Sequence, residues 1–223
     1  EGCGASRRVR EAITMLDVAC ELRPCPLGAV RHRREAAVAM SGNPSASAGE
    51  ARLPFLEDAS TGVKLSGADA IVEYLYDRYL DGAAPSPLVA PGPLAEARAQ
   101  VAVNSRGSDD GSGNPRGTFR RGPAGTFYAR PSRAPERPLQ LWAYEASPFC
   151  AVVRETLCEL EIPYVLQPCA RGSTRRTSLA RRAEGAFQVP YLEDPNTGVA
   201  MFESADIVEY LRSSYQVSPP FER

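Results

Sequence analysis

The chain has 223 residues, of which 43% are hydrophobic and 24% are charged, and its formal net charge is −1. This balance is typical of a globular protein, and it gives no electrostatic reason to expect a nucleic-acid partner. No apolar run approaches the length of about 20 residues that a membrane-spanning helix needs. The six cysteines are too sparse for a disulfide-stapled secreted scaffold.

The chain contains an internal repeat. Residues 52–75 read RLPFLEDASTGVKLSGADAIVEYL, and residues 188–211 read QVPYLEDPNTGVAMFESADIVEYL. Upstream of these segments, Glu1–Gly28 aligns with Glu145–Gly172 without a gap. Two copies of roughly eighty residues are too long for a solenoid repeat and have the size of small domains.

The repeat predicts two domains with a linker between them. We expect one domain over residues 1–82, called here the first copy, and another over 137–218, called the second copy. The intervening residues 83–136 are rich in Gly, Pro, Ser, Ala and Arg and show no sustained hydrophobic period. Such a composition predicts a mostly disordered linker.

The first copy begins too late to supply a first strand. Because Glu1 aligns with Glu145, nothing in it corresponds to residues 139–144. In the layout expected for each copy that strand lies at the centre of the sheet, so the second strand of this copy would have no partner. Unpaired buried backbone groups are costly. We therefore expect a truncated sequence, which also begins with Glu1 rather than Met, and a first copy that does not fold stably alone.

The second copy predicts elements in the order β-α-β-α-β-β-α. Leu139–Tyr144 alternates apolar and polar residues and predicts a strand. Ser147 as N-cap and Pro148 in the first turn predict the start of a helix. The later elements are a strand over 163–167, a helix from 173 to about 184, a hairpin over 189–202 and a helix from 204 to about 215. This order is the thioredoxin-like layout, so the fold class is α/β with two such domains, the first lacking its N-terminal strand.

Three motifs of the second copy form an ordered set, namely Ser147–Cys150, Val189-Pro190 and Glu203-Ser204. The set resembles the N-terminal domain of glutathione transferases and the related glutaredoxins. The tandem arrangement resembles plant and algal chloroplast proteins with two such domains and no helical transferase domain. The resemblance implies glutathione, or another thiol-containing small molecule, as the ligand. It also implies a chloroplast location; without the resemblance we would expect a cytoplasmic one.

The resemblance gives four residues a role in holding glutathione. In the family the bond between Val189 and Pro190 is cis, which turns the preceding backbone outward to pair with the cysteinyl part of the tripeptide. Glu203 presents a carboxylate to the γ-glutamyl ammonium. The hydroxyl of Ser204 and the N–H groups at the start of the last helix meet the γ-glutamyl carboxylate.

Ser147 and Cys150 lie at the start of the first helix of the second copy, where the helix dipole and free N–H groups stabilise a thiolate. Redox-active members of the family have cysteine where this chain has Ser147, and serine cannot form a mixed disulfide. Redox chemistry would therefore need Cys150 alone or a redox pair with Cys169, which follows the second strand. Ser147 could instead donate a hydrogen bond to the thiolate of bound glutathione. The alternative is an N-cap serine and inert, buried cysteines.

The first copy retains less of the site. Its motif Cys3-Gly-Ala-Ser6 places cysteine at the nucleophile position, and it keeps the dipeptide Leu53-Pro54. Gly67-Ala68 replaces Glu-Ser, so strong glutathione binding is not expected there. Cys3 could be a reactive thiol if the missing strand were restored. We expect no metal site, because the only histidine, His32, lies in the other copy from the cysteines of the second site.

Two functions of different classes follow. The first is glutathione binding in the second copy, with transferase-like or glutaredoxin-like monothiol chemistry if the protein is an enzyme. The second is a non-catalytic thioredoxin-fold scaffold that contacts protein partners. The chain shows no helical domain after the second copy to bind an electrophile, which weakens the transferase interpretation but leaves glutathione binding untouched.

Overall fold

The structure is a computed structural model, and it describes residues 1–92, 94–95, 97–98, 101, 128–185 and 187–217. Most of the predicted linker, including 102–127, lies outside the described residues, so the linker stays a prediction. Within the described part of the chain, no helix has the length and apolar character needed to cross a bilayer.

The second copy has the predicted order of elements. They are β4 (Leu139–Ala143), α5 (Pro148–Glu159), β5 (Tyr164–Pro168), α6 (Arg175–Arg182), β6 (Tyr191–Asp194), β7 (Val199–Met201) and α7 (Ser204–Tyr215). β4 lies at the centre of the sheet, parallel to β5 and antiparallel to β6, and β7 follows β6 at the edge. The fold class is therefore α/β and thioredoxin-like, as the sequence predicts.

The first copy repeats this order from its first helix onward, with one short 3-10 helix added. Its elements are α1 (Gly4–Met15), β1 (Cys20–Leu22), α2 (Arg31–Ser41), η1 (Ala48–Glu50), β2 (Phe55–Asp58), β3 (Val63–Ser66) and α3 (Ala68–Tyr79). No described strand precedes α1. The hairpin of β2 and β3 forms a two-stranded sheet of its own.

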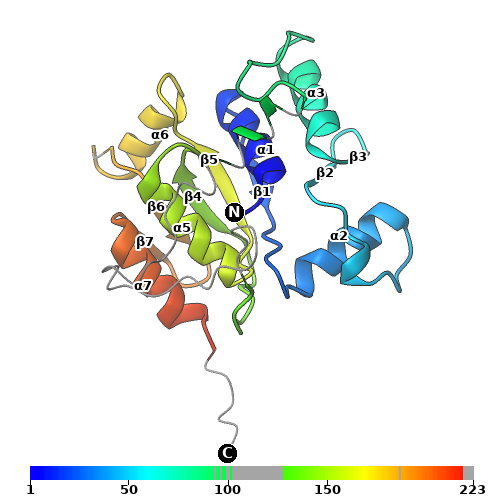
Figure 1. The fold of residues 1–223 in the computed structure, drawn as a ribbon. Helices are drawn as coiled ribbons and strands as arrows, with labels where there is room; N and C mark the ends of the chain where they lie inside the picture. The colour runs from blue at the N-terminus through cyan, green and yellow to red at the C-terminus, as the bar shows by residue number, and fades with distance from the viewer. Residues whose placement is uncertain (93, 96, 99–100, 102–127, 186, 218–223) are drawn as a thin grey trace, which may run out of the picture.

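The expectation that the second strand of the first copy lacks a partner is wrong. That strand is β1, and it pairs antiparallel with β5 of the second copy, so one sheet runs in the order β1-β5-β4-β6-β7 (Figure 1). An edge strand offers a row of unpaired N–H and C=O groups that another strand can use. The sequence prediction failed because it considered pairing only within each copy.

The pairing of β1 with β5 follows an approximate twofold symmetry. Cys20 pairs with Leu166 and Leu22 pairs with Tyr164. In the alignment of the two copies Cys20 corresponds to Tyr164 and Leu22 to Leu166. Cys20 thus meets the counterpart of Leu22, and Leu22 meets the counterpart of Cys20. The same exchange occurs in an interface between identical subunits related by a twofold axis. The two copies associate as a homodimer would, within one chain.

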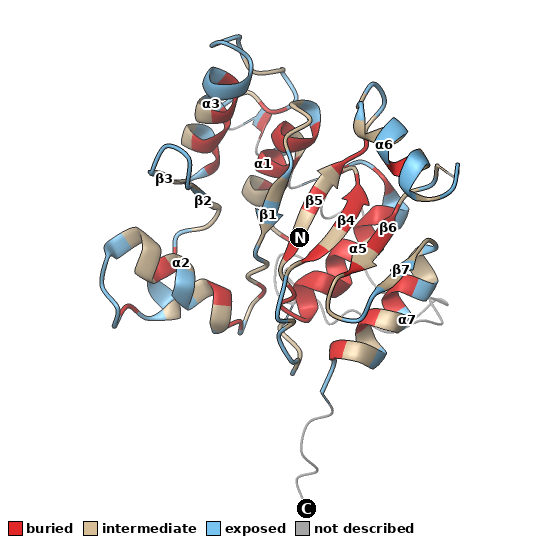
Figure 2. Ribbon diagram, turned by 180° about the vertical axis from the view of Figure 1, so that it is seen from behind, coloured by how far each residue is buried: buried red, intermediate tan, exposed pale blue. Residues whose placement is uncertain are grey.

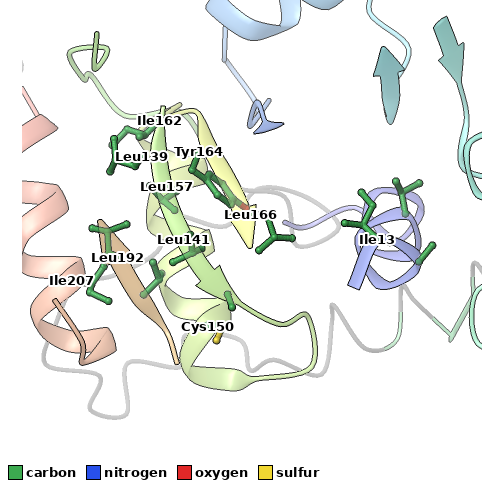
Figure 3. Close-up of a cluster of buried hydrophobic side chains, with 14 of the residues drawn as sticks. Ile13, Leu139, Leu141, Cys150, Leu157, Ile162, Tyr164, Leu166, Leu192 and Ile207 are labelled. Carbon is green, nitrogen blue, oxygen red and sulfur yellow. The ribbon is translucent and has the colours of Figure 1, made fainter. Parts of the chain in front are cut away.

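One hydrophobic core spans both copies. Leu139 and Leu141 of β4 are fully buried, and they pack against α5 and α7 on one face of the sheet (Figure 3). The same cluster continues through Leu166 of β5 to Ile13 of α1. Trp142 points to the opposite face, where it meets Leu179 of α6. Burial is densest around β4 and β5, and much of α2 and the hairpin of the first copy is exposed or half-buried (Figure 2).

The same contact fixes the hairpin turn to the last helix in both copies. Tyr210 donates to Asp194 at 2.7 Å, and the equivalent Tyr74 donates to Asp58 at 2.6 Å. Asp194 is 1% exposed and also accepts from Tyr215. Burial opposes ionisation of Asp194, but the hydrogen bonds from the two tyrosines and the neighbouring turn outweigh burial, so its pKa lies below the ordinary value. Both aspartates are thus structural.

We expect Asp194→Ala to lower the free energy of unfolding by about 3 kcal/mol, because hydrogen bonds to a buried charged group are worth about 1.5–3 kcal/mol each and two tyrosine hydroxyls lose their acceptor. Asp58→Ala is the matched comparison. Its side chain is more exposed and water can replace the contact, so the loss should be clearly smaller. Urea denaturation of both variants checks this order, and equal losses would contradict it.

Candidate functional site

Ser147 caps α5 as predicted. Its Oγ accepts a hydrogen bond from the backbone N–H of Cys150 at 3.2 Å, and Pro148 opens the helix. Ser147 is 3% exposed and Cys150 is fully buried. Burial raises the pKa of the Cys150 thiol, and the hydrogen bond with Ser147 only partly opposes this. The first motif therefore holds a neutral, inaccessible thiol beside a serine that is already used as a cap.

Cys169 is fully buried on the other face of the sheet from Cys150. It packs in the cluster of Trp142 and Leu179, whereas Cys150 packs in the cluster of Leu141. Burial raises the pKa of the Cys169 thiol to about 12. Both cysteines are free thiols. A redox pair of Cys150 and Cys169 stays a prediction, and the burial of both thiols does not favour it.

The second motif forms a turn next to the start of α7. The peptide bond between Val189 and Pro190 is cis, as the resemblance implies, and Pro190 is buried while Val189 is half-buried. Gln188, which precedes this turn, donates from Nε2 to Oε1 of Glu203 at 2.6 Å. This hydrogen bond ties the second motif to the third, so four of the predicted site residues, Val189, Pro190, Glu203 and Ser204, lie in one place.

Glu203 has a backbone conformation that favours glycine. Its φ is +65°, and the equivalent residue of the first copy is Gly67, with φ +92°. A residue with a side chain in such a sparsely populated region typically costs about 1–3 kcal/mol. The side chain of Glu203 is exposed and does not cap its own helix. The second copy thus has an exposed carboxylate at a position where the first copy has glycine.

Glu203 and Ser204 together form the N-terminus of α7. The carbonyl of Glu203 accepts from the N–H of Ile207 at 2.9 Å, which closes the first turn. The N–H groups of the residues before Ile207 have no carbonyl within the helix to bind, and the helix dipole is positive at this end. The site can therefore hold a carboxylate on the helix N-terminus and a cation on the side chain of Glu203.

The first copy lacks this combination. Cys3 is the N-cap of α1, half-buried, with no cap hydrogen bond from its side chain. Leu53–Pro54 is also cis, but Arg52 replaces Gln188 and Gly67 replaces Glu203. No carboxylate or amide stands at these positions to bind an ammonium group. The first copy thus keeps the cis turn and lacks the exposed carboxylate.

A buried cluster of charges lies where the two copies meet, and the sequence prediction missed it. Arg10 of α1 contacts Glu145 at 3.0 Å and Glu1 at 3.2 Å. Arg154 of α5 contacts the same two carboxylates, each at 3.3 Å. Arg7 adds a contact to Glu145 at 3.4 Å. All five side chains are less than 10% exposed.

The cluster follows the same approximate twofold symmetry as the strands. Glu1 corresponds to Glu145 and Arg10 to Arg154 in the alignment, and each arginine binds the glutamate of both copies. Burial alone would raise the pKa of Glu145, but Arg10 and Arg154 outweigh it and lower that pKa. The signal available in the sequence was that both copies keep a glutamate and an arginine at equivalent positions.

A cavity of about 240 Å³ lies apart from these residues. It is lined by side chains of β1 and α2 and by residues around Pro138, including Arg23, His32 and Glu35. None of the predicted site residues lines it. Within the described ranges, no group of His, Cys, Asp or Glu side chains could hold a metal ion.

A family model described as the glutathione S-transferase N-terminal domain matches the chain over residues 1–82 and 141–219. The two segments cover most of the chain, and both contain the elements described above. Searches of curated proteins and of solved structures gave no match.

Proposed function

The chain belongs to the glutathione S-transferase N-terminal-domain family, and from this premise we propose that its second copy binds glutathione without forming a covalent bond. The γ-glutamyl group provides the anchor. Its ammonium pairs with the carboxylate of Glu203, and its carboxylate lies on the N-terminus of α7 beside Ser204. The backbone of Val189, before the cis bond to Pro190, pairs with the cysteinyl part.

The observation that carries this proposal is the position of Glu203. Its carboxylate is exposed, it lies at the positive end of α7, and Gln188 holds it next to the cis turn. A side chain at positive φ persists where the surrounding structure and function require it. In the first copy glycine occupies this place, so the proposed site belongs to the second copy alone.

Within this proposal Ser147 and Cys150 have secondary roles. The Oγ of Ser147 accepts from the N–H of Cys150, and its hydroxyl also interacts with the Cys150 thiol, so it would have to turn away from that thiol to donate to the sulfur of glutathione. Only 3% of Ser147 is exposed, so we assign the affinity to Glu203 and Ser204. Monothiol redox chemistry at Cys150 is the alternative, and the burial and raised pKa of this thiol weigh against it.

The proposal gives the first copy a structural role. Its α1 and β1 complete the sheet and the core of the second copy, and its own site lacks a charged anchor. The plant and algal type and the chloroplast location come only from the resemblance, and they are part of the proposal. A purely non-catalytic scaffold is compatible with the role of the first copy, but it leaves the strained Glu203 without a reason.

Calorimetric titration of the full chain tests the proposal. We expect saturable binding of glutathione and at least about tenfold weaker binding of cysteinylglycine, which lacks the γ-glutamyl anchor. Equal binding of the two thiols, or none of glutathione, would overturn the assignment. The titration is done with the thiols reduced, and the intact mass measured afterwards must show no glutathione adduct.

A further inference from the structure

The cavity of about 240 Å³ has a lining that comes from both copies and from the segment just before β4. The first copy supplies charged or polar residues from β1, from the residue after it and from the start of α2, namely Glu21, Arg23, Arg31, His32 and Glu35. The rest of the lining is Ala134, Pro135, Glu136, Pro138 and Pro163. Pockets for drug-sized ligands have about 300–1,000 Å³, so this volume suits a smaller molecule.

The charges that β1 brings to the cavity are not required by the fold. In the gap-free alignment of the two copies, Glu21 corresponds to Val165 and Arg23 to Gln167, so the second copy forms the equivalent strand without charges. In the first copy Arg23 contacts Glu21 at 2.7 Å and Glu35 at 3.2 Å. These three charges therefore satisfy one another on one part of the lining.

Two further charges of the lining have opposite signs and no ion-pair partner among the described residues. Arg31 donates only to backbone carbonyls, that of Glu161 at 3.3 Å and that of Ser132 at 3.5 Å. Glu136 is exposed and forms no salt bridge with any described residue. Since Arg31 and Glu136 do not pair with each other, a ligand with one negative and one positive group can neutralise both.

His32 adds a directed hydrogen-bond acceptor to the lining. It is only 5% exposed, and its Nδ1 lies 2.9 Å from the carbonyl oxygen of Pro24. A carbonyl oxygen only accepts, so Nδ1 carries the hydrogen and the neutral ring keeps a lone pair on Nε2. Nε2 has no hydrogen-bond partner in the part of the chain that the structure describes. Buried polar atoms normally have a partner, so a donor on a bound molecule would complete this ring.

We propose that the cavity binds a small apolar α-amino acid in its zwitterionic form. The carboxylate of the ligand pairs with the guanidinium of Arg31. Its ammonium donates to Nε2 of His32 and to the carboxylate of Glu136. Three half-buried prolines of the lining offer an apolar surface to the side chain of the ligand, namely Pro135, Pro138 and Pro163. None of these residues belongs to the proposed glutathione site.

Calorimetric titration of the full chain with L-leucine, L-leucinamide and N-acetyl-L-leucine tests the proposal. The amide lacks the carboxylate and the acetyl derivative lacks the ammonium, so each should bind at least about tenfold more weakly than leucine. Undiminished binding of leucinamide would mean a site for cations alone, and undiminished binding of acetylleucine a site for anions alone. Either result, or no binding of leucine at about 10 mM, would overturn the proposal.

Three variants connect the binding of leucine to the cavity. His32→Asn keeps an N–H group for the carbonyl of Pro24 and removes the lone pair of Nε2, so leucine should bind roughly tenfold more weakly. Glu136→Gln changes an exposed residue that the fold does not need, and it should weaken binding about threefold to fivefold, as expected for an exposed ion pair. Arg34→Gln changes an exposed residue of α2 that does not line the cavity, and it should bind leucine like the parent chain.

Unchanged leucine binding in both His32→Asn and Glu136→Gln would place the ligand elsewhere and overturn the proposal. The variant Glu136→Gln keeps the test decisive if His32→Asn fails to fold. Glutathione titration of the same variants is a separate measurement, so the amino-acid site can fail while the proposed function stands.

Discussion

Replacing Glu145 with leucine is expected to lower the free energy of unfolding by about 3–5 kcal/mol, because removal of one partner leaves buried charges uncompensated. Glu145 contacts Arg7, Arg10 and Arg154, and none of these arginine side chains is more than 9% exposed. In the parent chain the two glutamates of the cluster offset the cost of taking these arginines out of water. In the variant Glu1 is the only glutamate of the cluster that remains to do so. Urea denaturation of the full chain measures the loss.

An exposed ion pair of the same chain provides the control. Arg182 contacts Glu193 at 2.5 Å, but its side chain is 58% exposed. Exposed pairs contribute about 0–1 kcal/mol, so Arg182→Gln should have little effect. A loss for Glu145→Leu that is no larger than the loss for Arg182→Gln would show that the buried cluster does not hold the two copies together.

The cluster also predicts a loss of stability in acid. The pKa of Glu145 is lower in the folded protein than in the unfolded chain, where it is about 4.3. Its contribution is therefore complete above that unfolded value and is lost as the pH falls through the lower folded value. Glu145→Leu should remove this part of the pH dependence, so the difference in stability between parent and variant should shrink below pH of about 4.

Glu203→Ala is expected to weaken glutathione binding about ten- to a hundredfold, because the loss of one charge-assisted contact costs about 1.5–3 kcal/mol. Cys150→Ala should change the affinity little, because the thiol is fully buried inside the core. Calorimetric titration of the two variants gives the comparison. Undiminished binding by Glu203→Ala together with no binding by Cys150→Ala would mean that Cys150 holds the tripeptide covalently, in favour of redox chemistry.

A second substitution at the same position separates function from stability. Glu203→Gly reproduces Gly67 of the first copy and relieves the positive φ, so it should raise the free energy of unfolding by about 1 kcal/mol. The same variant should bind glutathione as poorly as Glu203→Ala. A stabilised protein that has lost its ligand cannot be explained by misfolding. A destabilised glycine variant would show instead that the Glu203 side chain is needed for the fold.

Local patterns in the sequence were sufficient for the elements of the second copy. The alternation of Leu139–Tyr144 and the Ser147-Pro148 start of α5 depend on neighbouring residues only, and both are present in the structure. The equivalence of Glu1 with Glu145 was also visible in the alignment. An alignment shows which residues are equivalent but not which of them meet. The pairing of β1 with β5 and the buried charge cluster therefore became visible only in three dimensions.

The site shows the same division between local and long-range information. The motifs located Val189, Pro190, Glu203 and Ser204, which the fold brings together at the start of α7. The accessibility of Ser147 depends on how the whole domain packs around it. The motif predicted a residue that faces the ligand, but Ser147 is only 3% exposed in the structure. The positive φ of Glu203 likewise depends on its tertiary surroundings.

The most direct test of glutathione binding in the second copy is a two-dimensional amide NMR titration of the isotope-labelled full chain. We expect concentration-dependent shifts at the amides of Val189 and Ser204 and none at Leu53 and Ala68, the equivalent residues of the first copy. The first copy thus serves as an internal control with the same cis turn. Shifts at Leu53 and Ala68 without shifts at Val189 and Ser204, or no shifts in either copy, would contradict glutathione binding in the second copy.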